Sequence, residues 1–265
     1  MERCRELADQ IGQPVMKWQA DLIAALRALL DGDVAGAESW GEQALVHGSA
    51  EPEALPAWGG QTVELRRVQG RLEEVVDLFQ DVASDPVVID DIVRAVMAAI
   101  YAELGDLDLA RPLTAHASDR GFEIPRDFLW TSVMIMYGET VATLGEADDA
   151  RVLHDMLIPY ADEVATSTVT VVGLVSATLS RLALVMGDPE GAVAHAERSL
   201  ELARRLRAPY WTARARILLA AARQGVGGAD TTTTALVEEA AATVAAHDFD
   251  GLSPLLERVR TGGAA

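Results

Sequence analysis

Residue types that carry enzyme chemistry occur in this chain, but not in catalytic spacings. No G-x-x-x-x-G-K-[ST] phosphate-binding loop surrounds the one lysine, Lys17. No G-x-S-x-G nucleophile turn occurs, and the single cysteine, Cys4, lies near the N-terminus. No histidine has a second histidine or cysteine at i+3 or i+4, where a helix would offer two metal ligands. The histidines are His47, His116, His154, His195 and His247.

We therefore expect no enzymatic activity, no cofactor and no metal site. The alternative is a hydrolase with an acid pair that the sequence does not reveal. Acid pairs such as Asp90–Asp91 and Asp148–Asp149 do occur, but both open predicted helices, where negative charge complements the helix dipole.

Binding chemistry is better supported, because charged residues stand at fixed distances before a series of glycines. These glycines are separated by 38, 35, 40 and 42 residues: Gly32, Gly70, Gly105, Gly145 and Gly187. Six residues before them stand Leu26, Glu64, Ala99, Glu139 and Arg181. Three residues before them stand Leu29, Arg67, Ala102, Ala142 and Leu184. A mostly apolar surface with a few charged groups is the usual composition of a binding site.

The elements that position these residues are predicted to be helix hairpins. Each glycine follows one helix-forming run and precedes another, which is the place for a residue with positive φ between two helices. Five residues after the glycines stand Ala37, Val75, Ala110, Ala150 and Ala192. Seven residues before them stand Ala25, Val63, Ala98, Gly138 and Ser180. Small residues on both sides of a turn let two antiparallel helices approach closely. The alternative is an alanine-rich bundle in which this spacing is a coincidence.

The predicted fold is all-α: a single domain, 1–265, built as an α-α superhelix of about six tetratricopeptide-like hairpins. The hairpins are expected at 15–48, 53–84, 87–120, 126–165, 167–207 and 209–247, followed by a capping helix at 251–260. Residues 1–12 resemble the second helix of a preceding hairpin, which indicates a fragment of a larger protein or an atypical cap. The stretch "TSTVTVVGLV", Thr166 to Val175, is interpreted as helix because its continuation has a helical period.

In such a superhelix the first helices of the hairpins line the concave face. Glu64, Arg67, Glu139 and Arg181 are therefore predicted to line one concave groove, with Trp130 and Trp211 at its rim. The alternatives are core packing for the two tryptophans, a surface ion pair for Glu64–Arg67, and a pair between Arg181 and Glu139.

The net charge of −19 argues against direct binding to nucleic acid, which depends on lysines and arginines. One segment differs, because 198–228 contains seven arginines and one acid. Five of these arginines form a candidate docking patch: Arg204, Arg205, Arg207, Arg214 and Arg216. The alternative is that they neutralise acidic neighbouring repeats. No signal peptide or membrane span is evident and only one cysteine occurs, so a cytoplasmic location is expected.

Several stretches resemble a known family. "ALRALLDGDVAGAE", "LRRVQGRLEEVVDLF", "AELGDLDLARPL", "LIPYADEVA" and "LVMGDPEGAVAHAERSLELARRLRAPYWTARARILLAAA" are similar to the tetratricopeptide-like C-terminal region of large actinobacterial signalling proteins. Those proteins join this array to an ATPase module, and some add a LuxR-type DNA-binding domain, as in MalT-like transcriptional regulators, or an adenylate cyclase. The resemblance implies an array that senses an inducer or partner and relays that event to the other domains of a parent chain.

The expected function is therefore a non-enzymatic module that binds a protein segment or a small-molecule inducer in its concave groove. A structural spacer or dimerisation array is the main alternative.

Overall fold

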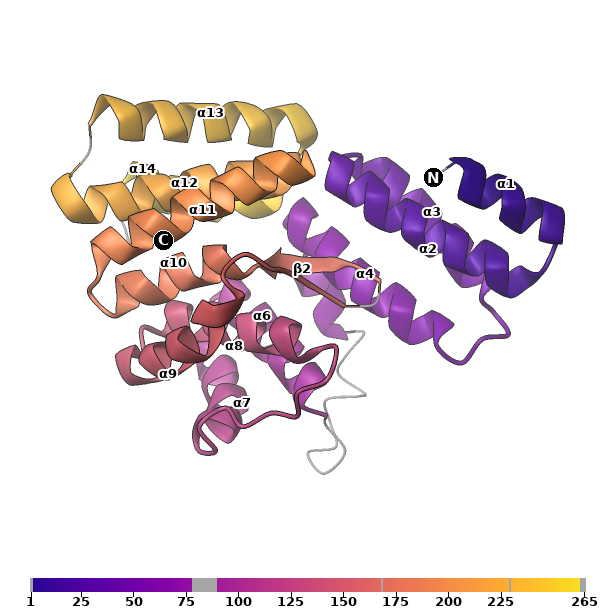
Figure 1. Ribbon diagram of the computed structural model, residues 1–265, viewed down its shortest axis with the longest axis horizontal. Helices are drawn as coiled ribbons and strands as arrows, with labels where there is room; N and C mark the ends of the chain where they lie inside the picture. The colour runs from indigo at the N-terminus through magenta and orange to yellow at the C-terminus, as the bar shows by residue number, and fades with distance from the viewer. Residues whose placement is uncertain (1, 78–89, 168, 229, 263–265) are drawn as a thin grey trace.

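The computed structural model describes residues 2–77, 90–167, 169–228 and 230–262 (Figure 1). The fold is an all-α superhelix in which consecutive helices pack as hairpins, as predicted. Helix α1 (Glu2–Ile11) packs on the first hairpin, formed by α2 (Pro14–Asp31) and α3 (Val34–His47). Helix α4 (Ala54–Gln69) follows, and the helix after it begins at residue 73 and leads into the residues that are not described.

Four further hairpins continue the array. They are α6 (Asp91–Leu104) with α7 (Leu107–Ser118), α8 (Trp130–Leu144) with α9 (Ala147–Leu157), α10 (Val175–Val185) with α11 (Pro189–Leu206), and α12 (Pro209–Gly227) with α13 (Thr231–His247). Short 3₁₀ turns η1 (Ile158–Tyr160) and η2 (Asp250–Leu252) follow α9 and α13, and α14 (Ser253–Arg260) is the last helix. Within the described part of the chain, no helix is both long and apolar enough to cross a membrane.

The repeated glycines have the backbone conformation that their spacing predicts. All five adopt positive φ, between 69° and 86°, at the end of the first helix of a hairpin. After two of them an aspartate caps the next helix: Asp33 accepts a hydrogen bond from the Gly36 N–H and Asp188 from the Gly191 N–H, each at 2.9 Å. The Gly-Asp pairs therefore end one helix and begin the next.

Small residues at the predicted positions allow the helices to pack closely. Ala110, Ala150 and Ala192 are fully buried. At Gly138, on α8, a Cβ atom would lie 2.5 Å from the Thr178 methyl group on α10, so any larger residue there would displace the Thr178 side chain.

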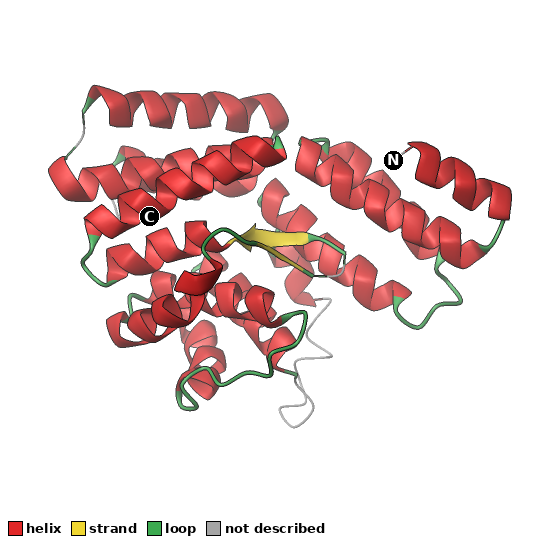
Figure 2. Ribbon diagram, viewed as in Figure 1, coloured by secondary structure: helices red, strands yellow, loops and turns green. Residues whose placement is uncertain are grey.

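One predicted helix is wrong. Val164–Thr166 (β1) and Val171–Leu174 (β2) pair as antiparallel strands, and helix α10 begins only at Val175 (Figure 2). The run of threonine and valine has high β propensity, and here that local preference prevails over the apparent helical period. The hairpin reaches α4, where the Gln61 side-chain amide donates to the Val169 carbonyl at 2.8 Å and to the Leu22 carbonyl at 2.9 Å. It therefore bridges parts of the array that are far apart in sequence.

The C-terminal segment also returns to the N-terminal half of the array. Turn η2 packs on α4, and a Cβ atom at Gly70 would lie 3.0 Å from the Asp250 carbonyl carbon. Leu252 is 2% exposed and belongs to the same apolar cluster as Val68 of α4. Helix α14 packs on α12 and α13. The β-hairpin and turn η2, which are far apart in sequence, thus both contact α4.

Candidate binding cavity

A cavity of about 250 Å³ lies on the inner side of the array. Its wall combines residues from α4, α6, α8, β2, α10, α12 and the η2–α14 segment. Ala99, Ala102, Ile135, Met136 and Trp211 form apolar parts of this wall. The charged residues among its lining are Arg67, Glu73, Glu103, Glu139, Arg181, Arg214, Asp250 and Arg258.

Glu139, on α8, is at the centre of one charged cluster. Its carboxylate accepts hydrogen bonds from Arg181, Arg214 and Thr178, each at 2.6 Å. Burial alone would raise its pKa, but the positive charges of Arg214 and Arg181 outweigh burial and lower the pKa of Glu139 to about 2. Glu139 is therefore a carboxylate that two arginines share.

Arg181, on α10, has one donor without a partner. It donates to Glu139 and, at 3.0 Å, to the Thr143 hydroxyl. Its side chain is 9% exposed, yet its Nε–H has no hydrogen-bond acceptor among the described residues. A buried donor in this condition costs about 1–3 kcal/mol.

Arg67, on α4, is at the centre of the second cluster. It forms an ion pair with Glu64 one turn earlier and donates to both carboxylate oxygens of Glu103, on α6, at 2.8 and 3.0 Å. Burial raises the pKa of Glu64, and the adjacent Arg67 charge opposes that rise. One guanidinium thus pairs with two carboxylates in this cluster, whereas one carboxylate pairs with two guanidinium groups in the cluster around Glu139.

The structure brings most of the predicted groove residues together. Arg67, Glu139, Arg181 and Trp211 line the cavity. Glu64 lies beneath Arg67 and lines a small adjoining space next to Trp211. The pairs Glu64–Arg67 and Arg181–Glu139, considered as alternatives to a binding role, also form. The role of these residues in binding stays a prediction.

Trp130 does not lie at the rim. It is 4% exposed and packs in the core beside Tyr160, with ring centroids 5.1 Å apart. The Arg126 guanidinium covers its ring at 4.5 Å. Trp130 begins α8 at the end of the helix remote from Glu139, so it stabilises the hairpin rather than the cavity.

The predicted arginine patch does not form one surface. Arg214 turns inward to Glu139, and Arg216 pairs with Glu239 of α13 at 2.9 Å. Arg204, Arg205 and Arg207 are exposed. The spacing did not predict the inward turn of Arg214, because Arg214 stands 14 residues before Gly228, the positive-φ glycine that ends α12, and not six or three residues before it. Arg258 was missed for a similar reason, since it comes from α14, outside the hairpins.

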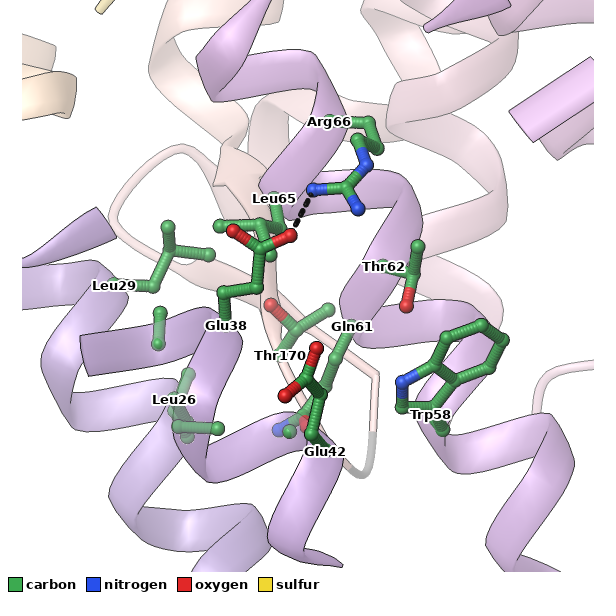
Figure 3. A pocket seen from close by; sticks show the side chains of 13 residues that line it. Leu26, Leu29, Glu38, Glu42, Trp58, Gln61, Thr62, Leu65, Arg66 and Thr170 are labelled. Carbon is green, nitrogen blue, oxygen red and sulfur yellow. Dashed lines mark hydrogen bonds and ion pairs between the residues drawn. The ribbon is translucent and has the colours of Figure 1, made fainter. Parts of the chain in front are cut away.

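Two other places in the fold bring polar side chains together. Figure 3 shows a pocket between α2, α3 and α4 in which Arg66 reaches Glu38 at 2.7 Å, but its volume of about 40 Å³ leaves room for little more than a water molecule. His154 and His195, on α9 and α11, bring their Nε2 atoms to 3.4 Å. The described residues contain no group of three or more His, Cys, Asp and Glu side chains arranged to hold a metal ion.

Comparison with known proteins identifies the type of fold but no family. No model of a known protein family matches this sequence, and no curated protein matches it. A solved structure, that of a Rap protein complexed with competence and sporulation factor, is similar with a TM-score of 0.58. The chain has a tetratricopeptide-like fold. The alignment covers 92% of this chain and 71% of the Rap chain at 13% identity, so the likeness extends to the fold alone. The resemblance to actinobacterial MalT-like regulators stays a prediction.

Proposed function

We propose that this chain is a non-enzymatic binding module that takes a short protein segment into the inner cavity. The observation that carries the proposal is the cavity wall, which combines side chains from most hairpins and includes two networks of buried charge. Buried ion pairs contribute little net stability, so a core selected for stability alone would be apolar here. Charged groups around a cavity instead give a ligand its orientation.

The occupant has to be small. A volume of about 250 Å³ is slightly below the range of about 300–1,000 Å³ typical of small-ligand pockets. It suits a few residues of an extended segment, and a small-molecule inducer is the second candidate. The Rap protein of similar fold was crystallised with competence and sporulation factor, which supports a ligand-binding role for this architecture. In a parent chain with ATPase, DNA-binding or cyclase domains, occupancy of the cavity would be the signal that the array relays.

The test is a selection of random short peptides displayed on phage against the purified chain. Enriched peptides are then measured by fluorescence anisotropy against Ala102→Phe, which fills the cavity from α6, and Ala194→Phe, which lies on the exposed face of α11. We expect Ala102→Phe to abolish binding and Ala194→Phe to leave it unchanged. Peptides that bind both variants equally, or a selection without enrichment, would contradict the proposal.

The alternative of a spacer or dimerisation array makes a different prediction. A dimerisation array would give twice the monomer mass in light scattering at increasing protein concentration. For either alternative, Ala102→Phe would have no effect on any binding event.

A further inference from the structure

Two histidines on neighbouring hairpins turn their rings toward each other. His154 lies on α9 and His195 on α11, the second helices of adjacent hairpins, and α10 packs on both of these helices (Figure 1). Their ring centroids are 5.5 Å apart but their Nε2 atoms only 3.4 Å apart, so each ring directs its Nε2 edge at the other. Neither histidine lines the inner cavity, so the pair is separate from the proposed peptide site.

The distance between the two Nε2 atoms fits a shared metal ion better than a direct hydrogen bond. A good N–H hydrogen bond joins its heavy atoms at about 2.7–3.2 Å, which makes 3.4 Å long for a direct bond between the rings. At that separation, Zn–N bonds of about 2.0–2.1 Å to both nitrogens give an N–Zn–N angle of about 108–116°. This range includes the tetrahedral angle that zinc adopts in proteins.

The charged groups around the pair are compatible with a cation. The Asp155 carboxylate lies 3.8 Å from Nδ1 of His154 and favours a proton on that nitrogen, which leaves the Nε2 lone pair free for a metal. Burial and the adjacent His154 lower the pKa of His195, so protons compete less for its lone pair. Arg198, one turn after His195, pairs with Asp162 at 3.0 Å, and its positive charge is thereby compensated.

We infer that His154 and His195 bind one Zn²⁺ ion that bridges α9 and α11. Both side chains are partly exposed, so water can fill the two remaining positions of the tetrahedron. Imidazole nitrogen is a ligand for zinc, copper and nickel, whereas magnesium and calcium prefer oxygen. Among the described residues no third His, Cys, Asp or Glu completes the group, so the ion would exchange with solution, unlike the ion of a structural site with four protein ligands.

The sequence could not reveal this pair, because metal ligands were sought within single helices. His154 and His195 are 41 residues apart and meet only because their two hairpins stack.

A bridging ion would act on the relative position of two hairpins. On the cavity side, Glu139 of α8 already accepts hydrogen bonds from Thr178 and Arg181 of α10. An ion between α9 and α11 adds a second connection between the same two hairpins and opposes their separation. The inference goes beyond the proposed function, since it requires no ligand in the cavity.

The experiment measures Zn²⁺ binding by isothermal titration calorimetry. Metal is first removed with EDTA, the chelator is removed by dialysis, and the buffer contains excess Mg²⁺ to occupy carboxylate sites on the acidic surface. The variants are His154→Gln and His195→Gln, each of which removes one ligand. His116→Gln is the matched control, because His116 is an exposed histidine on α7. Circular dichroism establishes which variants fold.

We expect the chain and His116→Gln to bind one Zn²⁺ with a dissociation constant on the order of 1–100 µM, since two imidazoles are half the ligand set of a structural zinc site. Each of the other two variants should bind at least about tenfold more weakly, because even residues that only orient metal ligands are worth that much. The thermal unfolding midpoint of the chain and of His116→Gln should rise with Zn²⁺ concentration, because the ion binds only the folded pair.

Two results would overturn the inference. One is a folded chain that shows no Zn²⁺ binding at micromolar concentrations. The other is an affinity for Zn²⁺, or a rise of the unfolding midpoint, that is the same in His116→Gln and in a folded variant of His154 or His195. Because the two ligands are replaced separately, either folded variant decides the question alone.

Discussion

The contact between η2 and α4 allows a sharp test, the substitution Gly251→Ala. A Cβ atom at Gly251 would overlap the Arg67 carbonyl oxygen, far inside the 3.0 Å below which real Cβ contacts essentially never fall. The Arg67 carbonyl cannot easily move, because it accepts the Gly70 N–H at 3.2 Å in the last turn of α4. The η2 turn must therefore withdraw. Gly251 does not require positive φ, so alanine adds only this overlap and no backbone strain.

The size of the expected loss of stability follows from the overlap at Gly251 and from the burial of Leu252 in the same turn. Overpacking of this kind costs about 1–3 kcal/mol. Withdrawal of the turn also begins to expose Leu252, whose complete exposure would cost about 1.5–3 kcal/mol. We therefore expect the free energy of unfolding to fall by about 1–3 kcal/mol. Because the C-terminal segment takes up the displacement, amide exchange of residues 250–260 should accelerate more than that of α10.

The assay is urea unfolding followed by circular dichroism, combined with hydrogen exchange. Gly59→Ala is the matched control, since it lies within α4 and a Cβ there meets nothing within 4 Å. It should raise stability by about 0.5–1 kcal/mol. An unchanged unfolding midpoint for Gly251→Ala, with slow exchange at residues 250–260, would refute the close contact.

Three further predictions concern the hairpins and the charged groups. Ala192→Leu should lower stability by about 1–3 kcal/mol in thermal or urea unfolding, because its site is fully buried, whereas Ala194→Leu on the exposed face of the same helix should change it by less than about 0.5 kcal/mol. Glu139→Gln should cost about 3–5 kcal/mol at pH 7, because two arginines lose their carboxylate. The pKa of Glu139 is about 2 in the folded chain and near 4.5 when unfolded. Its contribution to the free energy of unfolding is therefore complete above about pH 5 and is lost as pH falls towards 2. The stability of Glu139→Gln should accordingly fall less over this pH range. Burial and the adjacent His154 lower the pKa of His195, so folding favours its neutral form. The free energy of unfolding should therefore decline as pH falls below 6.5, and that of His195→Gln should decline less. Equal declines in the two proteins would exclude His195 as the cause.

Features set by local chemistry could be predicted from the sequence. The turn at Gly105, for example, follows from a glycine between two helix-forming runs, because only positive φ reverses the chain there. The groove position of Arg181 followed from counting back from Gly187 along a regular helix.

Features set by contacts between distant segments could not be predicted. The strand Val171–Leu174 has a local β preference, but the packing of its hairpin against α4 and α8 depends on distant residues and is not revealed by the sequence around it. The inward turn of Arg214 depends on Glu139, 75 residues earlier in the chain, and the position of Arg258 depends on the return of α14 across the array.

The contact of Gly251 with the end of α4 has a mechanical consequence. In a repeat array with free ends, each unit contacts only its neighbours, so it can adjust its tilt independently and units can be added or removed. Here the contact of η2 with α4 joins the C-terminal part of the array to its N-terminal part. A change in the tilt of one hairpin between them therefore has to be compensated by the other hairpins. We expect that deleting one unit, such as α10 with α11, would prevent η2 from reaching α4, even if each remaining hairpin kept its own contacts.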